Sequence, residues 1–508
     1  MFSVVTFKRA SAMKALCWLL VSMSGLLAHV GVLAEDVLRV GSKRFTESYI
    51  LGEILAQTAR PYANAEHKQG LGNTAIVFEA LKAGSIDLYP EYIGTIDREI
   101  LKHASPASIE SIRRELAAQG LGMSVPLGFN NSYALAMRAA DAERLQLRSL
   151  SDLAQHPHLR MGLSHEFLGR ADGWPGLAQR YALSQKATGL DHGIAYEALA
   201  NRQVDVIDIY STDAKIKQLG LRVLSDDLNY FPRYDAVLLY RLDIAQRFPQ
   251  AWQALQKLEG RITPDAMIAM NAAAELEGKT FSAIAKSFLT QGKSEVSART
   301  GFFAKLFDDS LLRLTREHIT LVLFSVSMAA LVGIPLGVVA SFVPKLRHTV
   351  MAVVGVLQTV PSLALLAMLI PVLGTIGVLP AMIALFLYAL LPIVRNTCTG
   401  ISQVPTGLRM AALALGLTRT DRLLHIDLPL SMPFILAGIK TAAVMSVGTA
   451  TIAAFIGAGG YGERIAIGLA LNDNDMLLAG AIPAAVLALV TQGLFEFVER
   501  VFAKRRGV

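Results

Sequence analysis

Few residues of this chain could carry out bond chemistry. His165 and Glu166 are adjacent and could act as an acid–base pair, but no nucleophile accompanies them, so we interpret them as hydrogen-bonding groups of a loop. Gly292-Lys293-Ser294 is the nearest match to a phosphate-binding loop, yet it lacks the first glycine of that motif and no apolar strand precedes it. The two cysteines, Cys17 and Cys398, cannot form a thiol cluster. We therefore expect no catalytic residues, no metal site and no cofactor bound by this chain.

The elements that would position a binding site occupy residues 35–300. Short apolar segments alternate there with segments of helical spacing, which predicts an α/β domain with largely parallel sheets. The predicted strands are Val37–Gly41, Ile86–Leu88, Arg160–Leu163 and Val204–Ile209, and the clearest helices are Phe45–Thr58 and Val77–Ala83. A module of this length suits two lobes, the second at about residues 132–230.

Binding loops are expected at the carboxyl ends of these strands. Ligands of open α/β sheets lie at those ends, where the loops converge. The places to look are therefore the loops after Gly41, Leu88, Leu127 and Ile209.

The second half of the chain has the pattern of a membrane domain. After a predicted linker at 301–317, long uncharged stretches follow within residues 318–508, and each approaches the ~20 residues needed to cross ~30 Å of hydrocarbon. Five spans are predicted, near residues 319–342, 350–371, 377–394, 435–456 and 476–495. Lys and Arg gather after the first, third and fifth spans, which places those ends inside the cell.

Composition agrees with this division. Apolar residues make up 53% of the 508 residues and charged residues 18%, which is too apolar for an ordinary soluble enzyme and too charged for spans alone. The net charge of +7 follows from the basic ends of the spans, and no basic helix indicates nucleic-acid binding.

The N-terminus has the features of an export signal. Basic residues precede an apolar stretch at about residues 15–32, and Val32-Leu33-Ala34 fits a cleavage site, which predicts a signal peptide at residues 1–34. An uncleaved anchor is the alternative. Under either interpretation, Glu35 onward lies outside the membrane.

A short pattern stands between the third and fourth predicted spans. Ala411-Ala412 is followed by Gly416 and by Ile426-x-Leu428-Pro429, and this spacing resembles the cytoplasmic loop of ABC-importer permeases. Met410 stands where that family usually has Glu. We expect the glycine to permit a sharp turn and the proline to end the helix before the next span. The resemblance implies a loop at about 395–432 on which a separate ABC ATPase docks, through Ala411, Ala412, Gly416, Leu428 and Pro429; an ordinary basic loop is the alternative.

Motifs of the first half resemble another component of the same systems. They are similar to the substrate-binding proteins of the glycine betaine/choline/carnitine uptake family over nearly all of residues 37–300. The motifs are Gly41-Ser42-Lys43-x-Phe45-Thr46-Glu47, Leu88-Tyr89-Pro90-Glu91-Tyr92-x-Gly94-Thr95, Asn130-Asn131-Ser132-Tyr133, Ser164-His165-Glu166-Phe167-Leu168, Asp208-Ile209-Tyr210-Ser211-Thr212-Asp213 and Tyr234-Asp235-Ala236.

This resemblance implies an aromatic cage for a quaternary ammonium group. Such a cation donates no N–H hydrogen bond, and aromatic faces attract it through their quadrupole. By local motif the cage tyrosines are Tyr92, Tyr133, Tyr210 and Tyr234. Four faces at about 1 kcal/mol each give roughly 4 kcal/mol, whereas micromolar binding needs about 8 kcal/mol. Other groups must hold the far end of the ligand, and the candidates are Asn131, Thr74 and Thr95.

The two resemblances together imply a two-lobed, type II-like periplasmic binding protein fused to an all-α ABC-importer transmembrane domain of about five spans. Such a chain would sit in a bacterial inner membrane with its N-terminal domain in the periplasm. It would form a homodimer, work with an ATPase partner that binds the ATP, and take up glycine betaine, choline or carnitine. Another betaine-like zwitterion such as ergothioneine is the alternative ligand.

Two other classes of membrane protein fit less well. A membrane-bound solute sensor would need a cytoplasmic signalling domain, and only a short segment follows the fifth span. A cation-driven carrier would need carboxylates inside its spans, and spans one to three have none.

Overall fold

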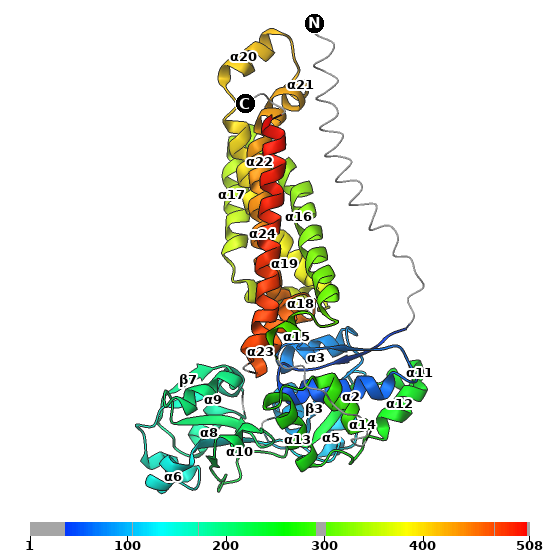
Figure 1. Ribbon diagram of the computed structural model, residues 1–508, viewed down its shortest axis with the longest axis vertical. Coiled ribbons are helices and arrows are strands. Elements are labelled where there is room, and N and C mark those ends of the chain that lie inside the picture. Colours follow the sequence, from blue (N-terminus) through cyan, green and yellow to red (C-terminus); the bar gives the residue numbers. More distant parts are fainter. Residues whose placement is uncertain (1–35, 104, 171, 291–300, 472, 505–508) are drawn as a thin grey trace. The chain divides into compact units, whose positions relative to one another are not determined.

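The computed structural model describes residues 36–103, 105–170, 172–290, 301–471 and 473–504 (Figure 1). The predicted signal peptide lies outside the described residues. The first half contains two five-stranded sheets, and the second half is helical. The predicted combination of a two-lobed α/β domain with a helical domain is therefore confirmed.

The first lobe is built on a sheet of strand order β2-β1-β3-β10-β4. Helices α2 (Thr46–Ala59), α3 (Thr74–Lys82) and α5 (Ile109–Ala117) belong to this lobe, and so do α12 (Pro249–Gln256), α13 (Pro264–Glu275) and α14 (Phe281–Leu289), which follow β10. The strands are β1 (Leu38–Gly41), β2 (Ala65–Lys68), β3 (Leu88–Tyr92), β4 (Leu121–Met123) and β10 (Ala236–Arg241).

The second lobe has the same pattern, with strand order β7-β6-β8-β5-β9. Its helices include α7 (His165–Gly169), α8 (Trp174–Arg180) and α9 (His192–Ala200). The strands are β5 (Tyr133–Arg138), β6 (Met161–Ser164), β7 (Ala187–Leu190), β8 (Val206–Tyr210) and β9 (Leu221–Val223).

The prediction of largely parallel sheets is confirmed for four of the five strands in each sheet. In each sheet one strand runs against both of its neighbours: β10 against β3 and β4, and β5 against β8 and β9. These are the strands that adjoin the two crossings between lobes. The crossing segments lie side by side, since Asn130 and Asp235 form an antiparallel bridge. A strand that enters a sheet from the other lobe inserts between existing strands and reverses direction, which local patterning does not reveal.

Strand β3 also differs from its prediction, because it begins at Leu88 instead of ending there. Strand β3 pairs with β1 only at Leu88, so Pro90 has no backbone partner on the β1 side. Proline has no N–H to donate, and it is tolerated at a position where no partner strand needs one. The loop that faces the other lobe therefore follows Tyr92, not Leu88.

The second half forms a helical bundle. Helices α16 (Leu311–Phe342), α19 (Val378–Ser402), α22 (Leu428–Thr449) and α24 (Asn474–Lys504) pack in sequence against one another. Gly333 and Gly337 of α16 let α19 approach closely, since a Cβ at Gly337 would lie 2.7 Å from Cβ of Thr397. Small residues at such crossings are typical of membrane helices. Residues 311–317, predicted as part of a linker, form the first turns of α16.

Among the described residues, four helical segments are long and apolar enough to span a membrane, or five if one bent pair is counted as a span. The pair is α17 (Pro344–Thr359) and α18 (Ser362–Leu373), which meet at 100°. The second predicted span, at 350–371, is therefore not one straight helix. Pro361 explains the break, because the residue before a proline avoids helical geometry, and Val360 is extended.

Candidate functional site

The four predicted tyrosines lie in one aromatic cluster between the lobes. Tyr133 begins β5 and Tyr210 ends β8, and these two residues pair directly across the antiparallel strands. Their ring centroids are therefore only 5.1 Å apart. Burial raises the pKa of both phenols well above the ordinary value, so both rings stay neutral.

Tyr92 joins this pair from the first lobe, and Tyr234 joins it from the second crossing between the lobes. Tyr234 lies in the second crossing, and its ring meets the Tyr133 ring edge-on at 5.7 Å. Tyr92 ends β3 and reaches the cluster through Phe45, whose ring centroid is 6.4 Å from Tyr92 and 5.4 Å from Tyr210. The strand ends and the crossing therefore bring together residues far apart in the sequence.

Three further rings that sequence reasoning did not assign belong to the cluster. Phe167 lies 5.1 Å and Phe231 6.4 Å from the Tyr133 ring. His192, at the start of α9, lies 4.5 Å from the Tyr210 ring. Phe45 and Phe167 stand inside motifs noted in the sequence, so the signal was present, but nothing local showed that their rings face the same space.

Two cations of the protein lie over these rings. The guanidinium carbon of Arg170 is 5.2 Å from the Tyr133 ring centroid, and Lys43 Nζ is 5.1 Å from the ring of Tyr92 and 5.6 Å from that of Phe45. Both side chains are almost fully buried. The aromatic faces thus already interact with positive charge, which is the interaction expected of a cationic ligand.

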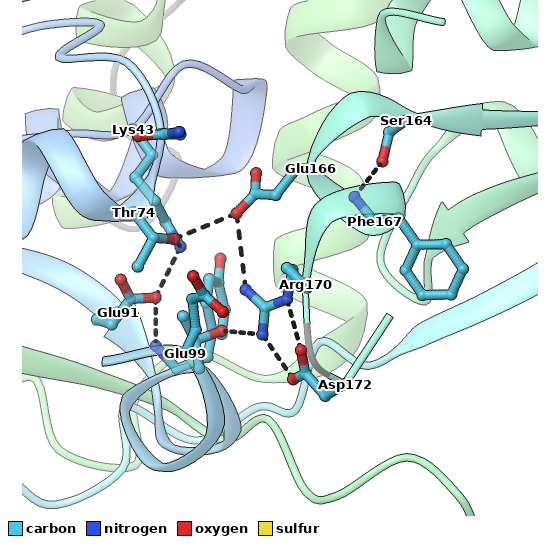
Figure 2. Close-up of polar contacts among 12 residues, drawn as sticks. Lys43, Thr74, Glu91, Glu99, Ser164, Glu166, Phe167, Arg170 and Asp172 are labelled. Carbon is cyan, nitrogen blue, oxygen red and sulfur yellow. Dashed lines mark hydrogen bonds and ion pairs between the residues drawn. The ribbon is translucent and has the colours of Figure 1, made fainter. Parts of the chain in front are cut away.

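Arg170 is held mainly by its neighbour Asp172 (Figure 2). Nε and Nη2 donate to the Asp172 carboxylate at 2.8 and 2.6 Å, and Nη2 also donates to Thr95 Oγ1 at 3.4 Å. Nη1 lies 3.6 Å from Glu166 Oε1, which is longer than a normal hydrogen bond. Asp172 in turn accepts a 2.6 Å hydrogen bond from the Tyr234 hydroxyl, so the guanidinium is fixed beside the cage.

A buried carboxylate, Glu47, lies at the start of α2 behind the cage. It accepts hydrogen bonds from the Tyr92 hydroxyl at 2.5 Å, Thr212 Oγ1 at 2.5 Å, Asn131 Nδ2 at 2.9 Å and Asn271 Nδ2 at 3.3 Å. Burial raises the pKa of Glu47, while these four donors act in the opposite direction. Glu47 therefore fixes the orientation of Tyr92 and joins both lobes.

The predicted polar residues all lie in this region, and each bonds to the protein itself. Thr74 Oγ1 lies 3.5 Å from Lys43 Nζ and donates to Glu166 at 3.2 Å (Figure 2). Thr95 accepts from Arg170, and Asn131 donates to Glu47. That any of them holds a ligand stays a prediction. Lys43, Arg170 and Glu47 are the polar groups that sequence reasoning missed.

The lobes are in contact across the site. Thr74 to Glu166, Thr95 to Arg170 and Glu47 to Thr212 are hydrogen bonds between the first lobe and the second. Next to Tyr210 a cavity of about 50 Å³ remains, lined by residues of both lobes that include Phe45, Asn131 and Tyr196. Its volume would hold a few water molecules. We therefore describe this arrangement as a closed cleft.

A titratable pair lies under the Tyr210 ring. His192 Nε2 is 3.0 Å from Asp213 Oδ2, and that carboxylate also accepts from the Tyr196 hydroxyl at 2.6 Å. Burial acts to lower the pKa of His192, but the Asp213 carboxylate outweighs this effect and raises it to about 9. The imidazole is therefore protonated at neutral pH and forms an ion pair.

The segment between α19 and α22 contains short helices at one end of the bundle (Figure 1). Ala411 and Ala412 lie in α20 (Thr406–Ala414), and Gly416 follows it with a positive φ of +72°, which is the sharp turn expected there. Beyond it, α21 (Arg419–Arg422) continues into a π-helical turn (Leu423–Asp427) and then into α22.

Pro429 does not end a helix, contrary to expectation. It lies in the first turn of α22, where the preceding π-helical turn has already changed the hydrogen-bond pattern. The loop is fixed instead by Asp427, whose fully buried carboxylate accepts from Arg409 Nε at 3.3 Å and Arg422 Nε at 3.1 Å. Apolar side chains are exposed on α20 and just beyond it: Leu408, Met410, Leu413 and Leu415.

A two-lobed binding domain and a multi-pass helical domain in one chain define a solute-binding protein fused to a membrane permease. Residues 36–291 match the family described as the substrate binding domain of the ABC-type glycine betaine transport system. Residues 333–504 match the binding-protein-dependent transport system inner membrane component. The chain therefore belongs to the glycine betaine-type ABC importers, as the sequence motifs predicted. Members of this family are transport components, not enzymes, and their ATPase is a separate subunit.

Individual relatives match either half of the chain. The choline transport system permease protein OpuBB of Bacillus subtilis is 44% identical over 190 residues, which are 37% of this chain and 87% of the relative. The glycine-betaine-binding protein of Pseudomonas aeruginosa is 34% identical over 300 residues, covering 55% of this chain and 94% of the relative. The ergothioneine transport permease/ergothioneine binding protein EgtU of Helicobacter pylori is 32% identical over 279 residues, which are 54% of this chain and 50% of the relative.

Proposed function

We propose that this protein captures a trimethylammonium compound of the glycine betaine, choline or carnitine type in the periplasm and passes it through its own permease domain. The observation that supports the ligand class most strongly is the convergence of Tyr133, Tyr210 and Tyr234 with Tyr92 and Phe45. Aromatic faces bind a methylated cation that can donate no hydrogen bond. In the ligand-bound form, the ammonium group lies against the faces of these rings.

Arg170 is the group best suited to bind a carboxylate at the other end of the ligand. Its guanidinium has five N–H donors, and Asp172 and Thr95 use only those of Nε and Nη2. Among the described residues, the polar contact of Nη1 is its 3.6 Å approach to Glu166 Oε1. A charge-assisted bond to this group supplies part of the affinity that four aromatic faces cannot.

The energy for transport comes from a separate cytoplasmic ATPase that docks on α20 and the turn at Gly416. The exposed leucines and Met410 form an apolar surface there, which a partner would cover. Met410 gives apolar contact at the position where a glutamate would form an ion pair. We expect two copies of the chain and two ATPase subunits in the working transporter.

Ergothioneine is the second candidate ligand, since the relative EgtU is named for it. It carries the same trimethylammonium and carboxylate groups, so the cage and Arg170 suit it equally. The discriminating experiment is calorimetric titration of the full chain in nanodiscs with choline, glycine betaine, carnitine and ergothioneine. Binding of one of the first three at tenfold or higher affinity than ergothioneine supports the main proposal. Tighter binding of ergothioneine favours the alternative, and no heat with any of the four would refute both.

A further inference from the structure

A second cavity, open on the side of the exposed residues Thr359, Pro361 and Met445, lies at the break between α17 and α18. Its volume is about 340 Å³. It is lined by Gln358, Thr359, Val360, Pro361 and Ser362 at the break, by Tyr388 of α19, and by Ala442, Met445, Ser446, Thr449 and Ile452. No charged side chain is among these residues. The size is suitable for a small organic molecule.

Polar groups without partners face this cavity. Ser446 is only 3% exposed and lines the cavity, yet its hydroxyl forms no hydrogen bond within the described residues. The side chains of Gln358 and Ser362 also lack hydrogen-bond partners there. Buried polar groups in a membrane domain are normally satisfied, so the unpartnered hydroxyl of the buried Ser446, with the half-buried Gln358 and Ser362 beside it, indicates an occupant that hydrogen-bonds to these groups.

The broken helix adds two opposite partial charges to the same wall. Helix α17 ends at Thr359, and Val360 is extended with no backbone bond that caps the helix, so the last carbonyl groups carry partial negative charge. Helix α18 begins at Ser362 directly after Pro361, and its first N–H groups carry partial positive charge. Because the helices meet at 100°, both ends lie beside one cavity. Broken membrane helices use their ends in this way to bind ions and charged substrates.

One aromatic ring completes the wall. The Tyr388 hydroxyl donates to the carbonyl oxygen of Val360, which holds the ring at the end of α17. The ring and the α17 carbonyls suit a cation without N–H groups. The hydroxyls and the α18 N–H groups suit a carboxylate or hydroxyl at the other end of the ligand.

We infer that this cavity is a second, weaker binding site for the transported solute, occupied within the permease domain after release from the tyrosine cage. The trimethylammonium group lies against Tyr388 and the C-terminal end of α17, and the carboxylate lies near Ser446 and the N-terminal end of α18. The absence of a lining carboxylate keeps binding weak, which a transit site needs because the solute must leave again. The inference rests on the proposed trimethylammonium function.

The test separates this site from the cage in the full chain. Saturation-transfer NMR on the methyl protons of glycine betaine detects millimolar binding to the chain in nanodiscs. A Tyr133→Leu/Tyr210→Leu variant removes the tight binding at the tyrosine cage, so any binding that remains belongs to a second site. We expect a residual saturable signal. Tyr388→Leu should weaken that residual binding about fivefold or more, the loss of one aromatic face. Tyr388→Phe should retain it. Ser446→Ala should weaken the binding of glycine betaine more than the binding of tetramethylammonium. The control is Thr441→Ala on the same helix, which should change the binding of neither ligand because the Thr441 hydroxyl already donates to the Ala437 carbonyl.

Several outcomes would overturn the inference. A residual signal that does not saturate, or one equal in Tyr388→Leu and in the parent variant, assigns the cavity to lipid or water. If the double cage variant does not fold, the wild-type chain is measured at concentrations that fill the cage, and the same Tyr388 variants are compared. Tight binding in the wild type without a second phase rejects this site alone, whereas absence of tight binding rejects the proposed function itself.

Discussion

Tyr133 and Tyr210 face each other across the antiparallel pair of β5 and β8, and their ring centroids lie 5.1 Å apart. The register therefore fixes half of the cage within one lobe, before the cleft closes. Tyr92 ends β3 of the first lobe and Tyr234 lies in the second crossing, so both rings reach the cluster from outside that sheet.

Replacing one of these rings should weaken ligand binding without unfolding the chain. Tyr210→Ala should reduce choline affinity about fivefold to thirtyfold, the value of about 1–2 kcal/mol for a partly desolvated cation–π contact. Tyr210→Phe should retain most of the affinity because the ring remains. Titration calorimetry measures both, and Tyr62→Ala, an exposed tyrosine outside the cluster, is the control. Equal affinities for Tyr210→Ala and wild type would remove Tyr210 from the cage.

Removal of Arg170 should distinguish ligands with a carboxylate from those without one. The double variant Arg170→Met/Asp172→Asn removes both buried charges, so that neither is left unpaired. We expect glycine betaine and carnitine to bind at least tenfold more weakly, since a charge-assisted hydrogen bond contributes about 1.5–3 kcal/mol. Choline, which has no carboxylate, should change much less. A similar loss for all three ligands would show that Arg170 only supports the fold.

The single variant Arg170→Met gives a separate test of stability. It leaves Asp172, which is 2% exposed, without its cation. Breaking such a buried pair typically costs about 3–5 kcal/mol. The unfolding transition should therefore fall clearly below that of the double variant, and a transition equal to the double variant would contradict this expectation.

The His192–Asp213 pair should make the binding domain less stable at alkaline pH. The folded-state pKa of His192 is raised from 6.5 to about 9, so the protonated pair stabilises the fold fully below pH 6.5. This contribution is lost as the pH rises through 9. The thermal midpoint, followed by tryptophan fluorescence, should fall over that range in the wild type and less in His192→Asn. His158→Asn, at an exposed histidine of the same lobe, should behave as wild type.

The loop at about residues 395–432 should depend on Asp427 more than on its other acidic residue, Asp421. Asp427→Asn removes the charge that holds Arg409 and Arg422, so α20 should lose its fixed position. We expect ligand-stimulated ATP hydrolysis by the reconstituted complex to fall at least tenfold, with ligand affinity unchanged. Asp421→Asn is the matched control, because Asp421 is half-buried and forms the capping box of α21 with Thr418. Equal activity of the two variants would contradict a role for Asp427 in coupling.

Much of the architecture could be predicted from the sequence because it depends on local patterns. Runs of uncharged residues identified the spans, and alternating strands and helices identified the binding domain. The motifs around Tyr133 and Tyr210 placed both tyrosines near strand ends, where they lie. Gly416, in the left-handed conformation after α20, was also predictable, since few other residues adopt that conformation without strain.

Other features could not be predicted because they depend on contacts between distant segments. Arg170 over Tyr133, Lys43 over Tyr92 and the four donors of Glu47 are fixed by how the lobes meet. The bend at Pro361 turned one predicted span into two helices, because a hydropathy pattern records how apolar a segment is and not its direction. The return of β10 between β3 and β4 likewise left no local signal.

The sequence by itself determined the class of protein, the order of its two domains and which four tyrosines to expect in one cluster, since periodicity and motif spacing are properties of neighbouring residues. Only the tertiary structure decided that the rings share one space, that the protein's own cations already lie over them and that a broken helix borders a cavity. The physical reason is that strand pairing and helix packing join residues such as Tyr133 and Tyr210, whose separation along the chain carries no record of their distance in space.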